Sequence, residues 1–219
     1  MTSSQISNVK VLQMRTKQIL KIISEANTHE EETSTLATAV MQTSPHMDDL
    51  ERNEIVNFVK EYIQHVPAFL EEAEDISKKA GIFNEVKIIF ETCEDYFIMS
   101  DDLIPDHLGL IGLMDDAYLA HQLIQSISDG YRENTGEPLL LIDMTRANQL
   151  IRMLIGEPIA TTLDEIIITV MVDTYILNSL QLLIDYGMKS PIKWNDPVWD
   201  DATIDEIVDE HLVVMKVVL

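Results

Sequence analysis

The fold is decided by residues 82–116, which read IFNEVKIIFETCEDYFIMSDDLIPDHLGLIGLMDD. In the first half of this stretch, apolar side chains recur three and four positions apart, at Val86, Ile89, Phe90, Cys93 and Phe97. This spacing predicts a helix with one buried face. Pro105 disfavours helical geometry at the residue before it, and Asp115 and Asp116 then fall in the first turn of a further helix. The stretch therefore predicts a helix, a turn and a second helix.

The same spacing continues along the rest of the chain, which contains only seven glycines and seven prolines. It predicts an all-α fold, an irregular bundle of about seven to nine helices in a single domain over residues 1–219. We expect Pro67 to separate two helices, Gly81 and Gly156 to end helices, and the segment from His29 to Thr35 to be a polar connection. The expected helices span residues 4–26, 44–66, 67–80, 82–99, 113–128, 143–155 and 161–186, with a short apolar stretch at 36–41 and an acidic C-terminal segment, residues 191–219, docked on the body.

The charge balance excludes some classes of function. The 219 residues carry 15 Lys and Arg against 38 Asp and Glu, a formal net charge of −23. A field of this sign repels nucleic acid and anionic membrane surfaces, so we expect no direct nucleic-acid binding. The single cysteine and the lack of a secretory signal favour a cytoplasmic protein. The most apolar window, Ile166 to Ile184, contains Asp173, which favours a buried helix over a membrane span.

Acidic residues without counter-charges mark the candidate site. Between Ile88 and Tyr131 the chain has nine carboxylates and no Lys or Arg. Carboxylates in such a segment are exposed, protonated, paired with distant residues or bound to a cation. The candidate metal ligands are Asp102, Asp106, Asp115 and Asp116, with Mg²⁺ or Ca²⁺ as the ion. His107 and His121 are candidate nitrogen ligands for a transition metal. In the alternative interpretation the four aspartates cap the turn and the helix that follows.

The same segment resembles the YkvA-like family, a bacterial helical family of unknown function. The resemblance rests on Asp102-Leu103-Ile104-Pro105-Asp106, on Tyr96 before it, and on Gly112 with Asp115 and Asp116 after it. It covers residues 96–124, the motif core, and departs from the family pattern where Ser100-Asp101 replaces Ser-Pro and where Gly109 replaces a second proline. The resemblance implies a helical fold and no defined activity.

No nucleophile motif or phosphate-binding loop is present, which favours a non-enzymatic role. The acidic composition predicts an interaction module that binds a basic protein partner, as an inhibitor, an antitoxin or immunity protein, or an adaptor. Aromatic residues flanked by charge indicate the contact surface, at Trp194, Trp199, Asp200 and Asp201. The alternative is a divalent-metal-binding protein or metal-dependent hydrolase that uses the four aspartates. The sequence also leaves a homo-oligomer open.

Overall fold

The computed structural model describes residues 3–43, 45–100, 102–140 and 143–173, and these residues form helices and no strand. The all-α bundle expected from the sequence is confirmed, with seven α-helices in the described part of the chain. The elements are α1 (Ser3–Thr33), α2 (Thr35–Thr43), α3 (Asp49–Ala80), α4 (Phe83–Ile98), the short 3₁₀ helix η1 (Asp106–Leu108), α5 (Leu113–Thr135), α6 (Thr145–Ile155) and α7 (Ile159–Asp173).

Helix α1 is longer than the sequence predicted. The segment from His29 to Thr35, expected to be a polar connection, is helical as far as Thr33, and Ser34 alone separates α1 from α2. The buried carboxylate of Glu30 explains the sharp junction, because it accepts hydrogen bonds from the backbone N–H groups of Leu36 (2.8 Å) and Ala37 (3.2 Å). One end of α1 therefore caps the start of α2.

Helix α3 runs through Pro67, where the sequence predicted a break. Its start is fixed by a capping box, in which Asp48 accepts from the N–H groups of Leu50 and Glu51 and the Glu51 side chain accepts from the N–H of Asp48. Pro67 is buried among the core residues of α3, so packing compensates the hydrogen bond that its ring removes. The predicted end at Gly81 is confirmed, with this glycine in the left-handed conformation.

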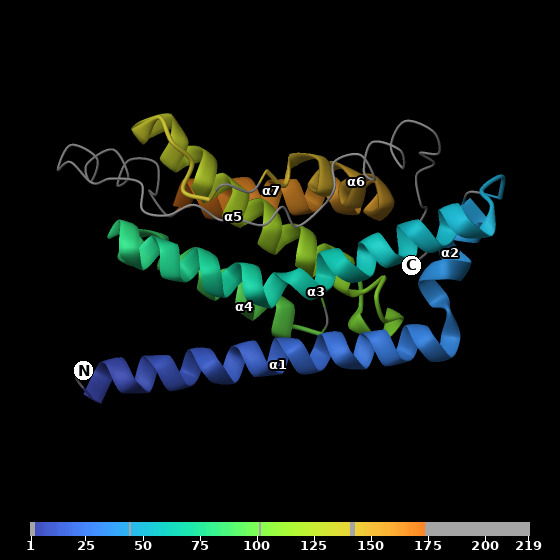
Figure 1. Cartoon of the computed structure of the whole chain (residues 1–219), viewed down its shortest axis with the longest axis horizontal. Helices are drawn as coiled ribbons and strands as arrows, with labels where there is room; N and C mark the ends of the chain where they lie inside the picture. The colour runs from blue at the N-terminus through green and yellow to red at the C-terminus, as the bar shows by residue number, and fades with distance from the viewer. Residues whose placement is uncertain (1–2, 44, 101, 141–142, 174–219) are drawn as a thin grey trace.

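Helix α5 lies at the centre of the bundle. It contacts α3 and α4 on one side and α6 and α7 on the other (Figure 1). Every residue from 109 to 121 is buried, which is the pattern of a helix surrounded by others. The sequence predicted that α5 ends near Gly130, but the helix continues to Thr135 and ends at Gly136, which has a φ of 81°. The predicted end of α6 at Gly156 is confirmed.

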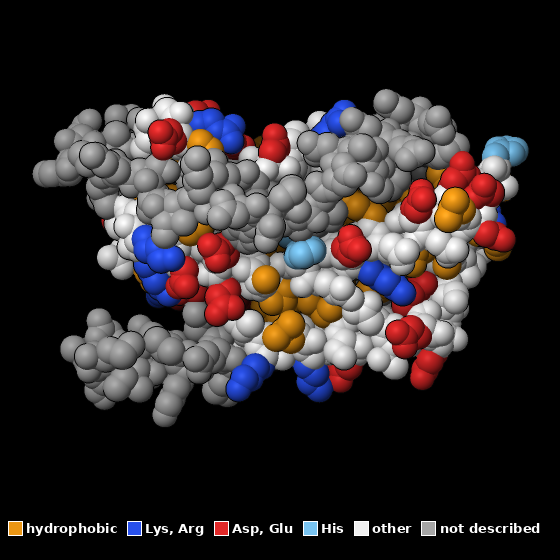
Figure 2. Space-filling model, viewed as in Figure 1, with side chains coloured by type: hydrophobic (Ala, Val, Ile, Leu, Met, Phe, Trp, Pro, Cys, Tyr) orange, Lys and Arg blue, Asp and Glu red, His pale blue; other side chains and the backbone are white. Residues whose placement is uncertain are grey.

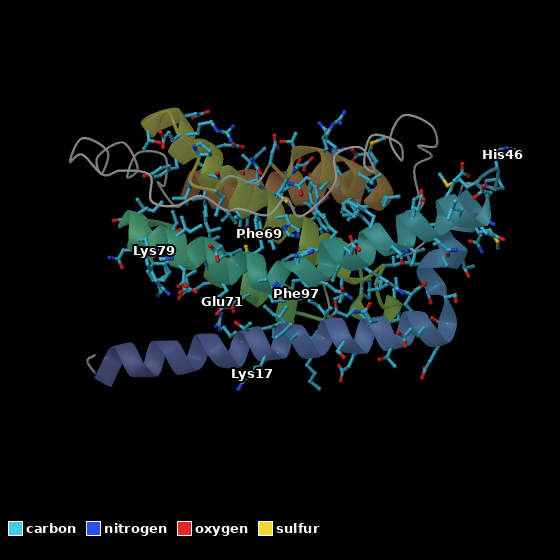
Figure 3. The ribbon with its side chains drawn as sticks, viewed as in Figure 1. Lys17, His46, Phe69, Glu71, Lys79 and Phe97 are labelled. Atoms are coloured by element: carbon cyan, nitrogen blue, oxygen red, sulfur yellow. The ribbon has the colours of Figure 1, made fainter. Side chains whose placement is uncertain are left out.

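Helix α1 forms an outer layer along one side of the bundle, against α3, α4 and η1 (Figure 1). It buries Ile19, Ile23 and Ala26, while Lys17 points away from the other helices (Figure 3). Arg15 fixes α1 to α4 through Glu94 (3.3 Å) and Asp95 (2.8 Å). The face of α1 that carries Arg15 and these buried residues is therefore the one that packs against the body.

Acidic side chains are spread over the face seen in Figure 2. One group lies at the start of α3, where Asp48, Asp49 and Glu54 are exposed. None of the described helices combines the length and the apolar character that crossing a membrane would require. The predicted acidic C-terminal segment, residues 191–219, lies outside the described residues, as do residues 174–184 of the apolar window that begins at Ile166.

Candidate metal centre

The chain folds back on itself between α4 and α5, and this brings the aspartates of the turn to the start of α5. Gly112 permits the close approach, since a Cβ atom there would lie 2.6 Å from the carbonyl oxygen of Pro105 and 2.8 Å from the Cα of Asp106. Gly112 has a φ of −62°, which any residue can adopt. The glycine is therefore required by the close packing and not by the backbone conformation.

Three of the four predicted ligands converge. Asp102, Asp115 and Asp116 each offer a carboxylate oxygen, and these three atoms all lie within 4.8 Å of one another. Asp115 and Asp116 are 0% and 1% exposed, whereas Asp102 is half-buried and stands nearer the surface. Asp106 is also half-buried, and its charge acts on both Asp102 and Asp116, but its carboxylate is not part of the convergent group. The sequence prediction thus named residues that the fold brings together.

The carboxylate of Asp115 is held in place by the protein. Its Oδ2 accepts a hydrogen bond from the backbone N–H of Ile104 (3.1 Å) and a longer one from the hydroxyl of Tyr96 (3.4 Å). Its Oδ1 is buried and has no hydrogen-bond partner. The two donors therefore orient Asp115 so that one oxygen remains available to a ligand.

The other buried oxygens of this site lack hydrogen bonds of ordinary geometry. These oxygens are both of Asp116, both of Asp102 and Oδ1 of Asp106, and the carboxyl groups of Asp102 and Asp116 interact with each other. The N-cap position of α5, Gly112, receives no side-chain cap hydrogen bond. Capping of α5, the alternative weighed from the sequence, therefore leaves Asp116 unexplained.

Burial and mutual repulsion make these groups difficult to ionise. Burial raises the pKa of Asp102 to about 6, and the charge of Asp106 adds to the shift. Burial is also the main cause that raises the pKa of Asp115, followed by the charge of Asp102. The pKa of Asp116 is raised well above its ordinary value by burial and then by the charge of Asp115. A cation among these oxygens would offset both effects.

The two candidate histidines do not join the site. His107 is exposed on η1, and the group of converging ligand atoms contains carboxylates alone. His121 is fully buried further along α5, where its Nε2 donates to the carbonyl oxygen of Tyr62 (2.9 Å) and burial lowers its pKa to about 4. An all-oxygen ligand set favours hard ions such as Mg²⁺, Mn²⁺ or Ca²⁺.

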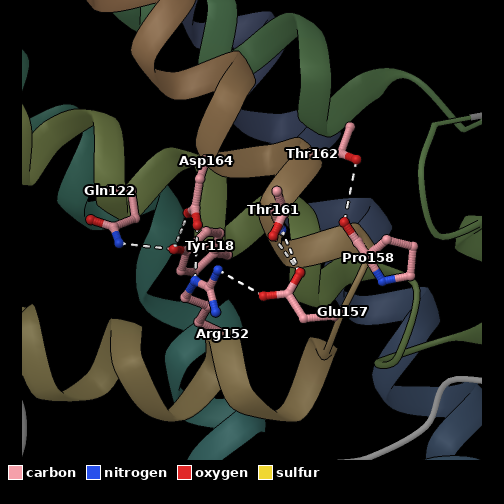
Figure 4. Close-up of polar contacts among 8 residues, drawn as sticks. All are labelled: Tyr118, Gln122, Arg152, Glu157, Pro158, Thr161, Thr162 and Asp164. Atoms are coloured by element: carbon pink, nitrogen blue, oxygen red, sulfur yellow. Dashed lines mark hydrogen bonds and ion pairs between the residues drawn. The ribbon is translucent and has the colours of Figure 1, made fainter.

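Sequence reasoning missed a second polar cluster, which joins α5, α6 and α7 (Figure 4). The hydroxyl of Tyr118 donates to Oδ1 of Asp164 (2.7 Å), and Nε of Arg152 donates to Oδ2 of the same carboxylate (2.9 Å). Arg152 also pairs with Glu157 (2.9 Å), and Gln122 donates to the Tyr118 hydroxyl (3.0 Å). Asp164 lies 46 residues from Tyr118 and 12 residues from Arg152, so the spacing of the residues that join the three helices carried no signal.

The predicted partner-binding residues, Trp194, Trp199, Asp200 and Asp201, lie outside the described residues. Binding of a basic protein through them stays a prediction.

Comparison with known proteins gives one match. Residues 96–121 match a family described as "Protein of unknown function (DUF1232)". No curated protein and no solved structure matches the chain. The match contains Tyr96 and all four aspartates of the site, and it includes the part of α5 that is buried all round. The chain thus contains a segment similar to a family of unknown function, and the YkvA-like name stays a prediction.

Proposed function

We propose that this protein binds a divalent cation through Asp102, Asp115 and Asp116, with Asp106 at the edge of the site. The observation that carries the proposal is Asp116, which is 1% exposed and whose carboxylate oxygens meet no N–H donor among the described residues, only the neighbouring carboxyl group of Asp102. Burying such a group without a partner costs several kcal/mol per ion by the general estimate for buried charges, about the scale of a domain's whole stability. A cation would remove that cost.

Basic side chains in the described part of the chain do not fill this role. None of the four aspartates takes part in an ion pair in the described part of the chain, and the nearest Lys and Arg in sequence are Lys87 and Arg132. Lys87 pairs with Glu91 and Arg132 pairs with Asp129. The described part of the chain therefore supplies no positive charge that balances the site.

The arrangement of the ligands suits a hard ion. Three converging oxygens within 4.8 Å of one another match the separation of ligand atoms around a cation that holds its oxygens at roughly 2.0–2.6 Å. The two deepest ligands come from the first turn of α5, and the half-buried Asp102 leaves one side nearer to solvent. Water molecules would complete the coordination there, as is usual for Mg²⁺.

The test is a calorimetric titration of chelator-treated protein with Mg²⁺, Mn²⁺ and Ca²⁺ in separate experiments. We expect saturable binding of one ion per chain for at least one of the three. Asp116→Asn should abolish it, while Asp75→Asn, which removes the same charge from an exposed position on α3, should leave it unchanged. Weak, unselective association that is equally reduced by both variants and by added salt would contradict the proposal, because that is the behaviour of a diffuse acidic surface.

A further inference from the structure

Helix α1 rests on the connection that carries the aspartates. Gly109, directly after η1, has a φ of 69°, and a Cβ atom there would lie 2.6 Å from Cδ2 of His29. The ring of His29, near the end of α1, therefore lies against the bare backbone of Gly109. A larger residue would strain the backbone and push His29 away.

Backbone hydrogen bonds connect Gly109 both to the turn and to α5. The N–H of Gly109 donates to the carbonyl oxygen of Asp106 (2.9 Å), and its carbonyl oxygen accepts from the N–H of Leu113 (3.2 Å). Leu113 is the first residue of α5 and lies two positions before Asp115. Gly109 is thus linked by one hydrogen bond to a turn aspartate and by another to the helix that carries the two buried aspartates. A change in the distance between the turn and α5 therefore moves Gly109.

The other side of the contact is also connected. Nε2 of His29 lies 3.5 Å from the hydroxyl oxygen of Thr35, and the neighbouring Glu30 caps the start of α2. The end of α1 and the start of α2 therefore move together. Arg15 holds α1 to α4 at a separate point, fourteen residues earlier, which does not involve the aspartate site.

We infer that a divalent cation at Asp102, Asp115 and Asp116 controls how firmly the C-terminal half of α1, together with α2, is held against the bundle. The inference rests on the proposed function. Without a cation each carboxyl group of the turn or of α5 that ionises repels the others, which favours movement of the turn away from α5 and of Gly109 with it. With the cation the two sides are drawn together, and His29 keeps its place. The ion would then act as a switch for an outer helix.

The experiment is hydrogen exchange measured by mass spectrometry on the full chain, with chelator and with saturating Mn²⁺, after Mn²⁺ binding has been measured by titration on the same sample. We expect exchange in residues 19–43 to slow by about tenfold when Mn²⁺ is bound. Residues 145–155 of α6 serve as the internal reference, because they take no part in the contacts described around Gly109. Their exchange should change little.

Two variants separate the possible outcomes. His29→Ala should still bind Mn²⁺ but lose most of the protection in residues 19–43, whereas Thr28→Ala, an exposed neighbour on α1, should keep it. If Mn²⁺ does not bind, the proposed function fails and this inference fails with it. If Mn²⁺ binds and exchange in residues 19–43 is unchanged, the inference alone is overturned. If His29→Ala kept the full Mn²⁺-dependent protection of residues 19–43, the contact between His29 and Gly109 would not be what couples the site to α1.

Discussion

Two clusters on α5 differ in whether the protein itself supplies partners for a carboxylate. Asp164, which reaches α5 from α7, is about one third exposed, and both of its oxygens are paired, one with the hydroxyl of Tyr118 and one with Arg152. Asp116, two residues before Tyr118, is 1% exposed, and neither of its oxygens is paired with a basic side chain or an N–H donor among the described residues. The group that loses more hydration is the one that the protein leaves unpaired.

The difference shows what kind of task each cluster performs. The Tyr118–Asp164–Arg152 cluster is complete without any ligand, because each charge meets an opposite charge or a hydrogen-bond donor, and it joins three helices. The aspartate site is incomplete, since its acceptors outnumber the donors that the described residues supply. A complete cluster stabilises the fold by itself, whereas under the proposed function we expect the incomplete one to stabilise it only with a cation bound.

The largest expected effect follows from adding and removing the cation. At a free cation concentration about one hundred times the dissociation constant, the free energy of unfolding should rise by about 2.7 kcal/mol over that of chelator-treated protein. Asp116→Asn should lose this response. In chelator, the same variant should be more stable than the wild type by on the order of 1 kcal/mol, because it removes a buried carboxyl from a group of like charges. Denaturant unfolding with and without the cation measures both differences.

A matched change on the other cluster should have the opposite sign. Asp164→Asn removes the charge that Tyr118 and Arg152 contact, so we expect a loss of about 1–2 kcal/mol of stability, reduced by the partial exposure of the pair. The loss should be the same with and without the cation. If Asp164→Asn and Asp116→Asn changed the stability of chelator-treated protein in the same direction, the contrast between the two clusters would not hold.

The sequence predicted local structure well where a single residue decides it. Gly81 and Gly156 end helices as expected, because these glycines adopt conformations with positive φ that other residues avoid. It failed where tertiary packing overrides local preference. Pro67 was expected to break a helix but lies inside α3, and Gly130 was expected to end α5 but is buried within it. These residues are held in a helix by the neighbours they pack against.

For the site, the sequence supplied the residues but not their roles. The absence of Lys and Arg between Ile88 and Tyr131 pointed to the four aspartates, and three of them converge. Nothing in the spacing indicated that Asp115 would be oriented by the N–H of Ile104, or that His29 would pack against Gly109. Such contacts depend on how the connection folds back, which a linear pattern does not contain.

Glu94 lies between Asp164 and Asp116 in this comparison, because it is buried but has a basic partner. It also makes the stability of the protein depend on pH. It is buried on α4 and has one partner, Arg15, and burial raises its pKa from 4.5 to about 7 even though Arg15 opposes the shift. Between these two values the folded protein binds more protons than the unfolded chain, so this group's contribution to stability is present below pH 4.5 and is lost as the pH rises through 7. As the pH rises from 5 to 8, the free energy of unfolding of Glu94→Gln should therefore increase by roughly 1 kcal/mol relative to that of the wild type.

Stability curves of both proteins across this pH range, recorded in chelator, measure the difference. Glu91→Gln, on the same helix and more exposed, is the control and should follow the wild type. A gap between wild type and Glu94→Gln that stays constant with pH would contradict the assignment.

The smallest expected effect concerns the two tyrosines and separates the clusters most directly. The Tyr96 hydroxyl donates to Oδ2 of Asp115 over 3.4 Å, a long bond that acts beside the stronger one from Ile104, so Tyr96→Phe should weaken cation binding by only about threefold. Tyr118→Phe removes the 2.7 Å bond to Asp164 and should lower the melting temperature while leaving the cation affinity unchanged. Titration measures the cation affinity of the two variants, and thermal unfolding measures their melting temperatures. If the aspartate site and the Tyr118–Asp164–Arg152 cluster act independently along α5, Tyr96→Phe changes mainly the affinity and Tyr118→Phe changes only the melting temperature. Equal effects of both variants on cation affinity would mean that α5 transmits changes between them.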